Sequence, residues 1–225
     1  MVVAFLPCRA GSERVVKKNT RPFGPAGESL FEIKLTHLLE SKLIDQVVVS
    51  TNDQDIIDLA KVAGDQRVKI DLRPDELCSS STSTDQLVEY VPSILDNDCH
   101  VLWTHVTSPF LTSHAYDKLI TKYFYALSEN DSLMTVTKHQ TFLWDNLRPI
   151  NYDRSVEKWP RTQSLKVIYE VNSAAFLAHI STYIEKKDRI GDKPYLYVLD
   201  SKECIDVDWP DEFELASMMY RSSLS

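Results

Sequence analysis

The feature that most constrains the fold is a short basic segment directly behind an apolar run. Residues 2–6 are apolar and valine-rich, which predicts a buried β-strand, and residues 7–19 follow with a glycine and a serine among them. Between Arg9 and Arg21 five cations accompany one acid, in a chain whose formal net charge is -8. Backbone N–H groups at the carboxyl end of a strand bind anions in α/β folds, and glycine lets such a loop turn tightly. The segment therefore predicts a phosphate site, with a solvated basic loop as the alternative.

The order of apolar patterns predicts the fold class. The expected strands cover residues 2–6, 46–50, 100–103, 131–136 and 195–199. The expected helices cover residues 30–39, 56–60, 87–95 and 115–124, and a last helix begins at Pro210. A further strand followed by a helix is expected within residues 174–187. This order predicts one domain, residues 1–225, with three α/β/α layers and a mainly parallel, Rossmann-like sheet. The periodicity fails from 142 to 160, which predicts an excursion that covers a site or meets another subunit.

Composition limits the partners and the compartment. A length of 225 residues with 43% hydrophobic content suffices for one sizeable core. The acidic balance argues against nucleic-acid or anionic-membrane binding, and no run approaches the roughly 18 apolar residues of a membrane span. Cys8, Cys78, Cys99 and Cys204 are scattered without a C-x-x-C pair, so we expect free thiols and a cytoplasmic protein.

A hydroxyl-rich stretch and a histidine each lie next to an expected element. Residues 79–84 are all serine or threonine and precede a helix, which predicts a mobile loop with a helix cap at Thr84 or Asp85. His105 follows the strand expected at 100–103. A histidine at a strand end is more often a surface residue, but it can also donate a hydrogen bond to a sugar or a carboxylate.

Two aspartates near the carboxyl end form a D-x-D pattern. In an extended segment residues two apart share a face, so Asp206 and Asp208 are expected to project together while Ile205 and Val207 enter the core. Two neighbouring carboxylates repel each other unless a cation lies between them, and oxygen ligands favour Mg2+. The pair is therefore a candidate metal site, with solvated surface acids as the alternative.

The amino-terminal segment resembles the signature of the CMP-sialic acid synthetase (acylneuraminate cytidylyltransferase) family. That signature, (I/L)-P-A-R-x-G-S followed by K-N, is matched by Leu6, Pro7, Arg9, Gly11, Ser12, Lys18 and Asn19. Cys8 stands at the usual alanine, and Glu13 and Arg14 stand at the usual Lys-Gly. These departures leave the class of the resemblance intact.

The resemblance continues along nearly the whole chain. Residues 73–77 match R-P-x-E-L, and residues 107–109 match T-S-P, with His105 at the usual glutamine. The family pattern R-x-Q, then Y and N, is matched by Arg161, Gln163, Tyr169 and Asn172, with Lys166 and Ser173 at the usual proline and glycine. Residues 206–208 match the terminal D-(I/V)-D of the family.

The resemblance implies a nucleotidyltransferase that transfers CMP from CTP to the anomeric hydroxyl of an acidic sugar, with Mg2+ as cofactor. It also implies a homodimer, in which the excursion near 142–160 takes part and the partner chain borders the sugar pocket. The nucleotide-binding residues that it implies are Pro7, Arg9, Ala10, Gly11, Ser12, Lys18, Asn19, Arg73, Ser83 and Thr84. Acceptor contacts would come from His105, Thr107, Arg161 and Gln163, the metal ligands would be Asp206 and Asp208, and catalysis would depend on Arg9, Lys18, Asp206 and Asp208.

Alternatives remain for the acceptor and for the reaction. The amino-terminal loop favours a nonulosonic acid over an eight-carbon ulosonic acid, because the latter branch usually has S-T-R-L-P at this point. Arg161 could pair with the sugar carboxylate through two parallel hydrogen bonds. A glycosyltransferase that uses a nucleotide sugar would also carry D-x-D, and a non-catalytic nucleotide-binding scaffold would keep the fold without the chemistry.

Overall fold

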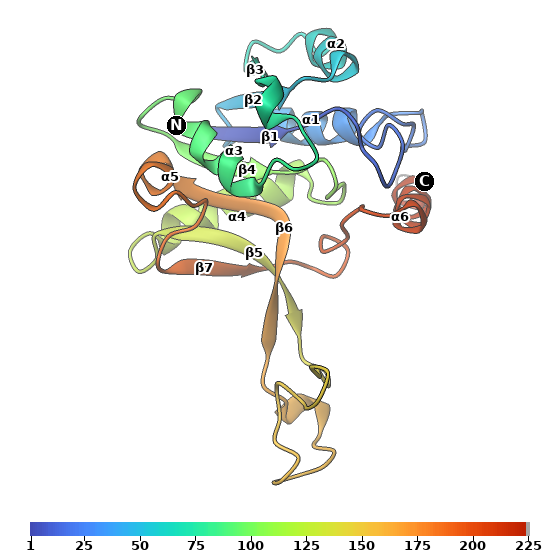
Figure 1. Cartoon of the computed structure of the whole chain (residues 1–225), viewed down its shortest axis with the longest axis vertical. Helices are drawn as coiled ribbons and strands as arrows, with labels where there is room; N and C mark the ends of the chain where they lie inside the picture. Colours follow the sequence, from blue (N-terminus) through green and yellow to red (C-terminus); the bar gives the residue numbers. More distant parts are fainter. Residues whose placement is uncertain (224–225) are drawn as a thin grey trace.

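The computed structural model describes residues 1–223, whose strands form a seven-stranded sheet between two layers of helices (Figure 1). The strands are β1 (Val2–Pro7), β2 (Gln46–Thr51), β3 (Val68–Leu72), β4 (His100–Thr104), β5 (Ser132–His139), β6 (Ile168–His179) and β7 (Pro194–Val198). The helices are α1 (Leu30–Glu40), α2 (Gln54–Val62), α3 (Thr84–Tyr90), α4 (Ser113–Ala126), α5 (Ile180–Lys186) and α6 (Pro210–Ser222). The predicted three-layer α/β/α fold is confirmed.

The sheet is parallel apart from one strand. Its order is β3-β2-β1-β4-β6-β5-β7, and only β6 runs antiparallel to its neighbours among the strands of residues 1–223. The sequence missed β3, because Lys69 and Asp71 interrupt its apolar residues. Such polar positions are tolerated since β3 is an edge strand that pairs with β2 alone.

The central strand β1 is apolar on both faces because helices cover both. Ala4 and Leu6 join the core that packs under α1, α2, α4 and α6, whereas Val3 and Phe5 face the smaller core under α3 and α5. The side chain of Phe5 is fully buried and meets the Trp103 ring edge-on at a centroid distance of 4.8 Å. Burial of a side chain of this size contributes about 1.5–3 kcal/mol, which fixes β1 and the loop that follows it.

Side-chain caps define where the helices begin. Asp53 caps α2, because its side chain accepts a hydrogen bond from the amide of Asp55. The predicted cap of α3 at Thr84 or Asp85 is wrong by one residue, since Ser83 accepts from the Gln86 amide while the Gln86 side chain bonds back to the Ser83 amide. This reciprocal pair satisfies two backbone donors, which a cap at Thr84 would leave unpaired.

A two-stranded arm projects from the sheet. β5 and β6 continue their pairing beyond the sheet, down to His139 and Ile168, and residues 140–167 form the tip (Figure 1). Asn151 holds the tip together, because its side chain donates to the carbonyls of Thr141 and Lys166 and accepts from the amide of Leu143. The excursion predicted near 142–160 lies within this tip. Among residues 1–223 no helix has the length and apolar character needed to cross a bilayer.

Candidate active site

A cavity of about 630 Å³ opens at the end of the sheet where β1 and β4 stop. Carboxyl ends of parallel strands are where α/β folds bind ligands. Its polar and charged lining comes from segments far apart in the sequence, namely Arg9, Ser12, Glu13, Arg14, Lys18, Asn19, Ser80, Thr84, His105, Thr107, Ser173, Arg189, Asp206 and Asp208. The cavity can therefore hold a polyanion and a second polar molecule together.

The basic loop behind β1 is held in place by backbone contacts. Gly11 has a φ of +76°, a left-handed conformation that a side chain would strain. The amide of Ala10 donates to the Asn52 side chain at 2.9 Å, and the carbonyl of Asn19 accepts from the first turn of α1 at Phe31. These contacts tie the loop to the ends of β2 and α1, so that Arg9 faces the cavity.

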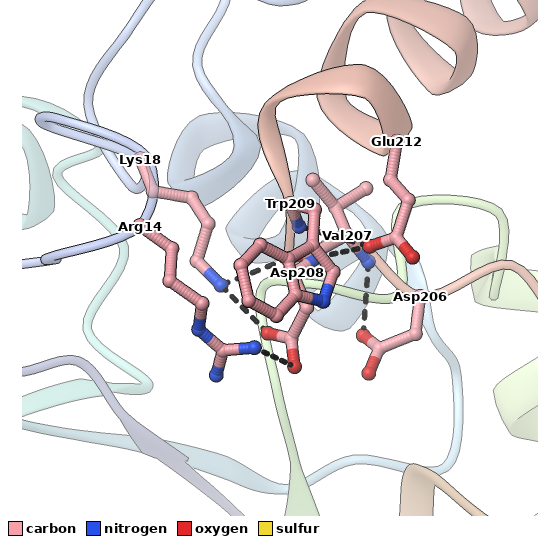
Figure 2. A network of polar contacts seen from close by, with 7 residues as sticks. All are labelled: Arg14, Lys18, Asp206, Val207, Asp208, Trp209 and Glu212. Atoms are coloured by element: carbon pink, nitrogen blue, oxygen red, sulfur yellow. Dashed lines mark hydrogen bonds and ion pairs between the residues drawn. The ribbon is translucent and has the colours of Figure 1, made fainter.

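The segment 206–208 brings two carboxylates to the basic loop (Figure 2). Val207 is fully buried, and its amide donates to the carbonyl of Thr107 at 2.9 Å. Lys18 Nζ lies 3.0 Å from Asp208 Oδ1, and Arg14 Nη1 lies 3.1 Å from Asp208 Oδ2 (Figure 2). Asp206 lines the same cavity, so the predicted arrangement of the D-x-D pair is confirmed.

The pKa values of the two aspartates are shifted in opposite directions. Burial raises the pKa of Asp206, and the negative charge of Asp208 adds to this, against hydrogen bonds that favour the carboxylate. Burial also opposes ionisation of Asp208, but the hydrogen bonds and charges of Lys18 and Arg14 hold the pKa of that carboxyl below its usual value. The pair thus combines one firmly ionised carboxylate with one that a further cation would stabilise.

His105 lies in the cavity wall as a neutral imidazole. The Trp103 indole Nε1–H donates to Nε2 of His105 at 2.9 Å, so the ring proton of the neutral form lies on Nδ1. Burial, followed by the positive charges of Arg189, Lys34 and Lys18, lowers the pKa of His105 to about 3. The ring therefore offers a hydrogen-bond donor near pH 7 and is a weak base.

A bulge between β5 and β6 delivers one hydroxyl to the cavity. The pairing shifts from Met134–Phe176 to Val136–Val171, and Thr135 Oγ1 fills the gap by bonding the backbone of Asn172 and Ala175. The Asn172 side chain donates to the carbonyl of Cys204 at 2.9 Å, which ties the bulge to the segment before the aspartates. Ser173, at the centre of the bulge, lines the cavity.

Comparison with known proteins decides the family. The profile of the family described as Cytidylyltransferase matches residues 3–217. The chain belongs to the cytidylyltransferase family. It is 24% identical to the pseudaminic acid cytidylyltransferase of Campylobacter jejuni serotype O:23/36, over 97% of this chain and 96% of that protein. It is also 24% identical to the N-acylneuraminate cytidylyltransferase of Escherichia coli O18:K1:H7, over 96% of this chain and 51% of that protein.

A solved structure with the same fold carries a nucleotide. CMP:2-keto-3-deoxy-manno-octonic acid synthetase, complexed with CTP, superimposes with a TM-score of 0.63 at 14% identity, over 97% of both chains. This likeness supports the α/β fold of the cytidylyltransferase described here. The resemblance found in the motifs is confirmed at the level of the family.

Most residues predicted for the site gather in the cavity of this cytidylyltransferase. These are Pro7, Arg9, Ser12, Lys18, Asn19, Thr84, His105, Thr107, Asp206 and Asp208. Ala10 and Gly11 line a smaller adjoining hollow of about 300 Å³, which Arg9, Ser12 and Asn19 share. The Gly11 amide thus remains a candidate for a phosphate contact at the rim, whereas the Ala10 amide already donates to Asn52.

Four further predicted residues line neither this cavity nor the adjoining hollow. Ser83 caps α3, and Arg73 is buried with its guanidinium on Ser50, at 3.0 Å from Oγ and 2.6 Å from the carbonyl oxygen. Arg161 and Gln163 are exposed on the arm tip. Their roles in nucleotide and acceptor binding stay predictions.

Sequence reasoning did not name Arg14, Ser80 or Arg189 among the site residues, although all three line the cavity. Arg14 belongs to the basic segment whose charge predicted a phosphate site, and in the structure it pairs with Asp208 and lies 5.0 Å from the ring centre of Trp209. Ser80 and Arg189 line the cavity as well, and only the hydroxyl-rich composition around Ser80 gave any signal. Nothing in the charged run before Arg189 distinguishes it from a solvated surface.

The donor set at the aspartate pair fits Mg2+ shared with a phosphate. Within residues 1–223 no group of three or more His, Cys, Asp or Glu side chains could hold a metal ion, so the protein offers two carboxylates. Mg2+ is commonly held by one or two carboxylates, with substrate phosphates and water as its other ligands. The raised pKa of Asp206 is consistent with this, because a cation beside the pair would relieve the repulsion from Asp208.

Proposed function

We propose that this protein transfers CMP from CTP to the anomeric hydroxyl of an acidic sugar, favouring a nonulosonic acid, and releases pyrophosphate. The observation that carries the proposal is the meeting of a basic loop and two carboxylates in one cavity. Arg9, Arg14 and Lys18 come from the loop, and Asp206 and Asp208 face them from the other end of the chain. Membership of the cytidylyltransferase family supports the same reaction.

The triphosphate would lie against the basic loop. Within residues 1–223 the guanidinium of Arg9 has no hydrogen bond or ion pair with the protein, so it is available to a phosphate. Lys18 and Arg14 reach the cavity from the same loop, and Ser12 adds a hydroxyl donor. Cations placed where charge develops stabilise phosphoryl-group transfer, in which the protein mainly positions reactants and balances charge.

Asp206 and Asp208 would hold Mg2+ together with phosphate oxygens. When bound, the ion would neutralise phosphate charge and polarise the reacting phosphoryl group. Lys18 and Arg14 keep Asp208 ionised, as a metal ligand must be. Loss of the charge at Asp208 should therefore weaken the metal site more than it disturbs the fold.

The acceptor would approach from the side of His105, Thr107 and Ser173. Its anomeric hydroxyl would attack the α-phosphorus in line, so that a P–O bond forms there, the bond to pyrophosphate breaks, and the hydroxyl proton passes to solvent water. With a pKa of about 3, His105 is too weak a base to take that proton near pH 7. We assign it to hydrogen bonding of the acceptor through Nδ1–H.

We also propose a homodimer joined through the arms. The tip exposes large apolar side chains, among them Trp144, Leu147 and Trp159, which an interface would cover. Arg161 and Gln163 lie on the same tip, from which they could border the cavity of a partner subunit. The free thiols at the four cysteines fit a cytoplasmic enzyme.

A panel of nucleotides and acceptors tests the proposed function. The protein is incubated with each of the four nucleoside triphosphates, Mg2+ and, in turn, sialic acid, its deaminated analogue, Kdo and a neutral hexose, while pyrophosphate is followed. We expect release with CTP and a nonulosonic acid. Release with the hexose alone, or no release with any acidic sugar, would contradict the proposal. A separate incubation supplies CMP-sialic acid in place of the triphosphate. Its consumption with transfer of the sugar to an acceptor, and without pyrophosphate, would indicate a glycosyltransferase.

A further inference from the structure

An arginine that follows α5, Arg189, lines the cavity close to β4 and β6. Arg189 is half-buried, and its guanidinium carbon lies 3.7 Å from the ring centre of Phe176 on β6 and 5.3 Å from that of Trp103 on β4. Guanidinium groups bind well to aromatic faces. The two rings are fixed in the core, so they hold the guanidinium at the cavity wall in a defined orientation.

The Arg189 guanidinium feels the charges of Asp188 and Asp85, but neither carboxylate forms an ion pair with it. Within residues 1–223 it forms no hydrogen bond or ion pair, although Arg14 and Lys18 in the same cavity both pair with Asp208. Burial lowers the pKa of Arg189, against the charges of Tyr183, Asp188 and Asp85, so a ligand anion that paired directly with the guanidinium would offset the cost of burying it. Arg9 is also unpaired, but it belongs to the loop that takes the phosphates.

Arg189 and His105 share one neighbour. The indole of Trp103 donates to His105 Nε2 through its edge and lies beside the Arg189 guanidinium with its ring. His105 consequently presents Nδ1–H, and the nearby positive charge of Arg189 helps to keep the imidazole neutral. A planar, five-donor cation and a neutral N–H donor thus lie close together in the cavity wall, on the β4 and β6 side.

We propose that Arg189 binds the carboxylate of the acceptor sugar, with His105 as a second donor, and that it is the residue of this chain that selects acidic acceptors. A guanidinium pairs with a carboxylate through two parallel hydrogen bonds, which a neutral sugar cannot accept in the same way. The inference rests on the proposed function and deepens it. It differs from the prediction for Arg161, which lies on the arm tip, outside this cavity.

The test crosses enzyme variants with acceptor variants. Wild type, Arg189→Ala and Arg189→Lys are assayed with sialic acid and with its methyl ester, which lacks the negative charge; Kdo and its ester replace them if Kdo is the better acceptor. Lys122→Ala is the matched control, because Lys122 stacks on the rings of Tyr125 and Tyr195 away from the cavity. KM for acceptor and for CTP, kcat and Tm are measured for each.

We expect Arg189→Ala to raise KM for the acid by roughly ten- to a hundredfold, as loss of a hydrogen bond to a charged group does. For wild type, KM for the ester should exceed KM for the acid by a similar factor. For Arg189→Ala, KM for the ester and KM for the acid should be almost equal. KM for CTP should change less than about twofold, Lys122→Ala should match wild type, and Arg189→Lys should fall between. Arg189→Lys keeps the charge and the stem, so it decides the test if Arg189→Ala does not fold.

Two results would overturn the inference. One is full discrimination between acid and ester in Arg189→Ala, and the other is a rise in KM for CTP with an unchanged KM for the acid, which would assign Arg189 to the nucleotide. Titration calorimetry with sialic acid, or Kdo, separates the inference from the proposed function. If wild type binds the acid without releasing pyrophosphate, and Arg189→Ala does not bind it, the reaction is wrong while the carboxylate site stands.

Discussion

Acidification should destabilise this protein through a histidine that the fold keeps neutral. His37 lies on α1, and its Nδ1 is buried without a hydrogen-bond partner among residues 1–223. Burial, followed by the charge of Lys34, lowers the pKa of His37 to about 4, against a hydrogen bond to the backbone of Leu111 that raises it. Protonation would place a donor in a site without an acceptor, beside an ammonium group.

The sign and size of the effect follow from linkage. The pKa of His37 is about 4 in the folded state and roughly 6.5 in the unfolded chain. The contribution of the neutral His37 to the free energy of unfolding is therefore fully present above about pH 6.5 and is lost as the pH falls toward 4. At about 1.4 kcal/mol per pH unit, the loss between roughly pH 6.5 and 5 is about 1.5 kcal/mol. His105, whose pKa burial lowers to about 3, adds a loss of the same sign and similar size over this range.

Urea denaturation at a series of pH values between 6.5 and 5 measures the loss. His37→Leu keeps the helix and removes the proton-binding site. Between pH 6.5 and 5 the free energy of unfolding should fall in both proteins, and the fall in wild type should exceed the fall in the variant by about 1.5 kcal/mol. His114→Gln, at an exposed position on α4, is the control and should keep the wild-type slope. A slope in His37→Leu as steep as that of wild type would refute the argument.

Three further substitutions test the site and the core. Lys18→Ala should lower kcat by about a hundredfold or more but lower Tm by only a few degrees, because its ion pair with the half-exposed Asp208 contributes about 1 kcal/mol at most. A large drop in Tm, with normal kcat at temperatures where the variant is folded, would make Lys18 structural. Asp208→Asn should abolish turnover without unfolding the chain, and near-normal turnover at limiting Mg2+ would contradict the metal assignment. Tyr116→Phe should lower the free energy of unfolding by roughly 1–3 kcal/mol with little change in kcat. The reason is that the Tyr116 hydroxyl hydrogen-bonds to buried Lys34, at 2.8 Å, and to Thr104, at 2.7 Å. An unchanged free energy of unfolding in urea would show that these hydrogen bonds are dispensable.

Much of the fold was predictable because apolar periodicity reports burial. The strands at 2–6, 46–50 and 100–103 are buried on both faces, so their sequences are almost wholly apolar. Strand β3 escaped because an edge strand pairs on one side only and tolerates polar residues. The cap of α3 was misplaced by one residue because six hydroxyl residues in a row offer several caps, and only the partner side chain of Gln86 selects Ser83.

The site was predictable where its residues are consecutive and less so where packing assembles it. The loop around Arg9 and Lys18 and the pair Asp206 and Asp208 were found because each carries a local pattern of charge. Arg189 was missed because its place in the cavity depends on rings contributed by β4 and β6, which no local pattern records.

Analysis of the reaction products distinguishes CMP transfer from simple hydrolysis of CTP. CTP, Mg2+ and the preferred acidic sugar are incubated with the protein, and the mixture is followed by phosphorus NMR and mass spectrometry. If the protein transfers CMP, we expect one new phosphodiester, in which the α-phosphorus is joined to the anomeric oxygen, in a one-to-one ratio with pyrophosphate. Neither product should form when the sugar is omitted. Free CMP in place of the phosphodiester, or pyrophosphate formed equally well without the sugar, would contradict it.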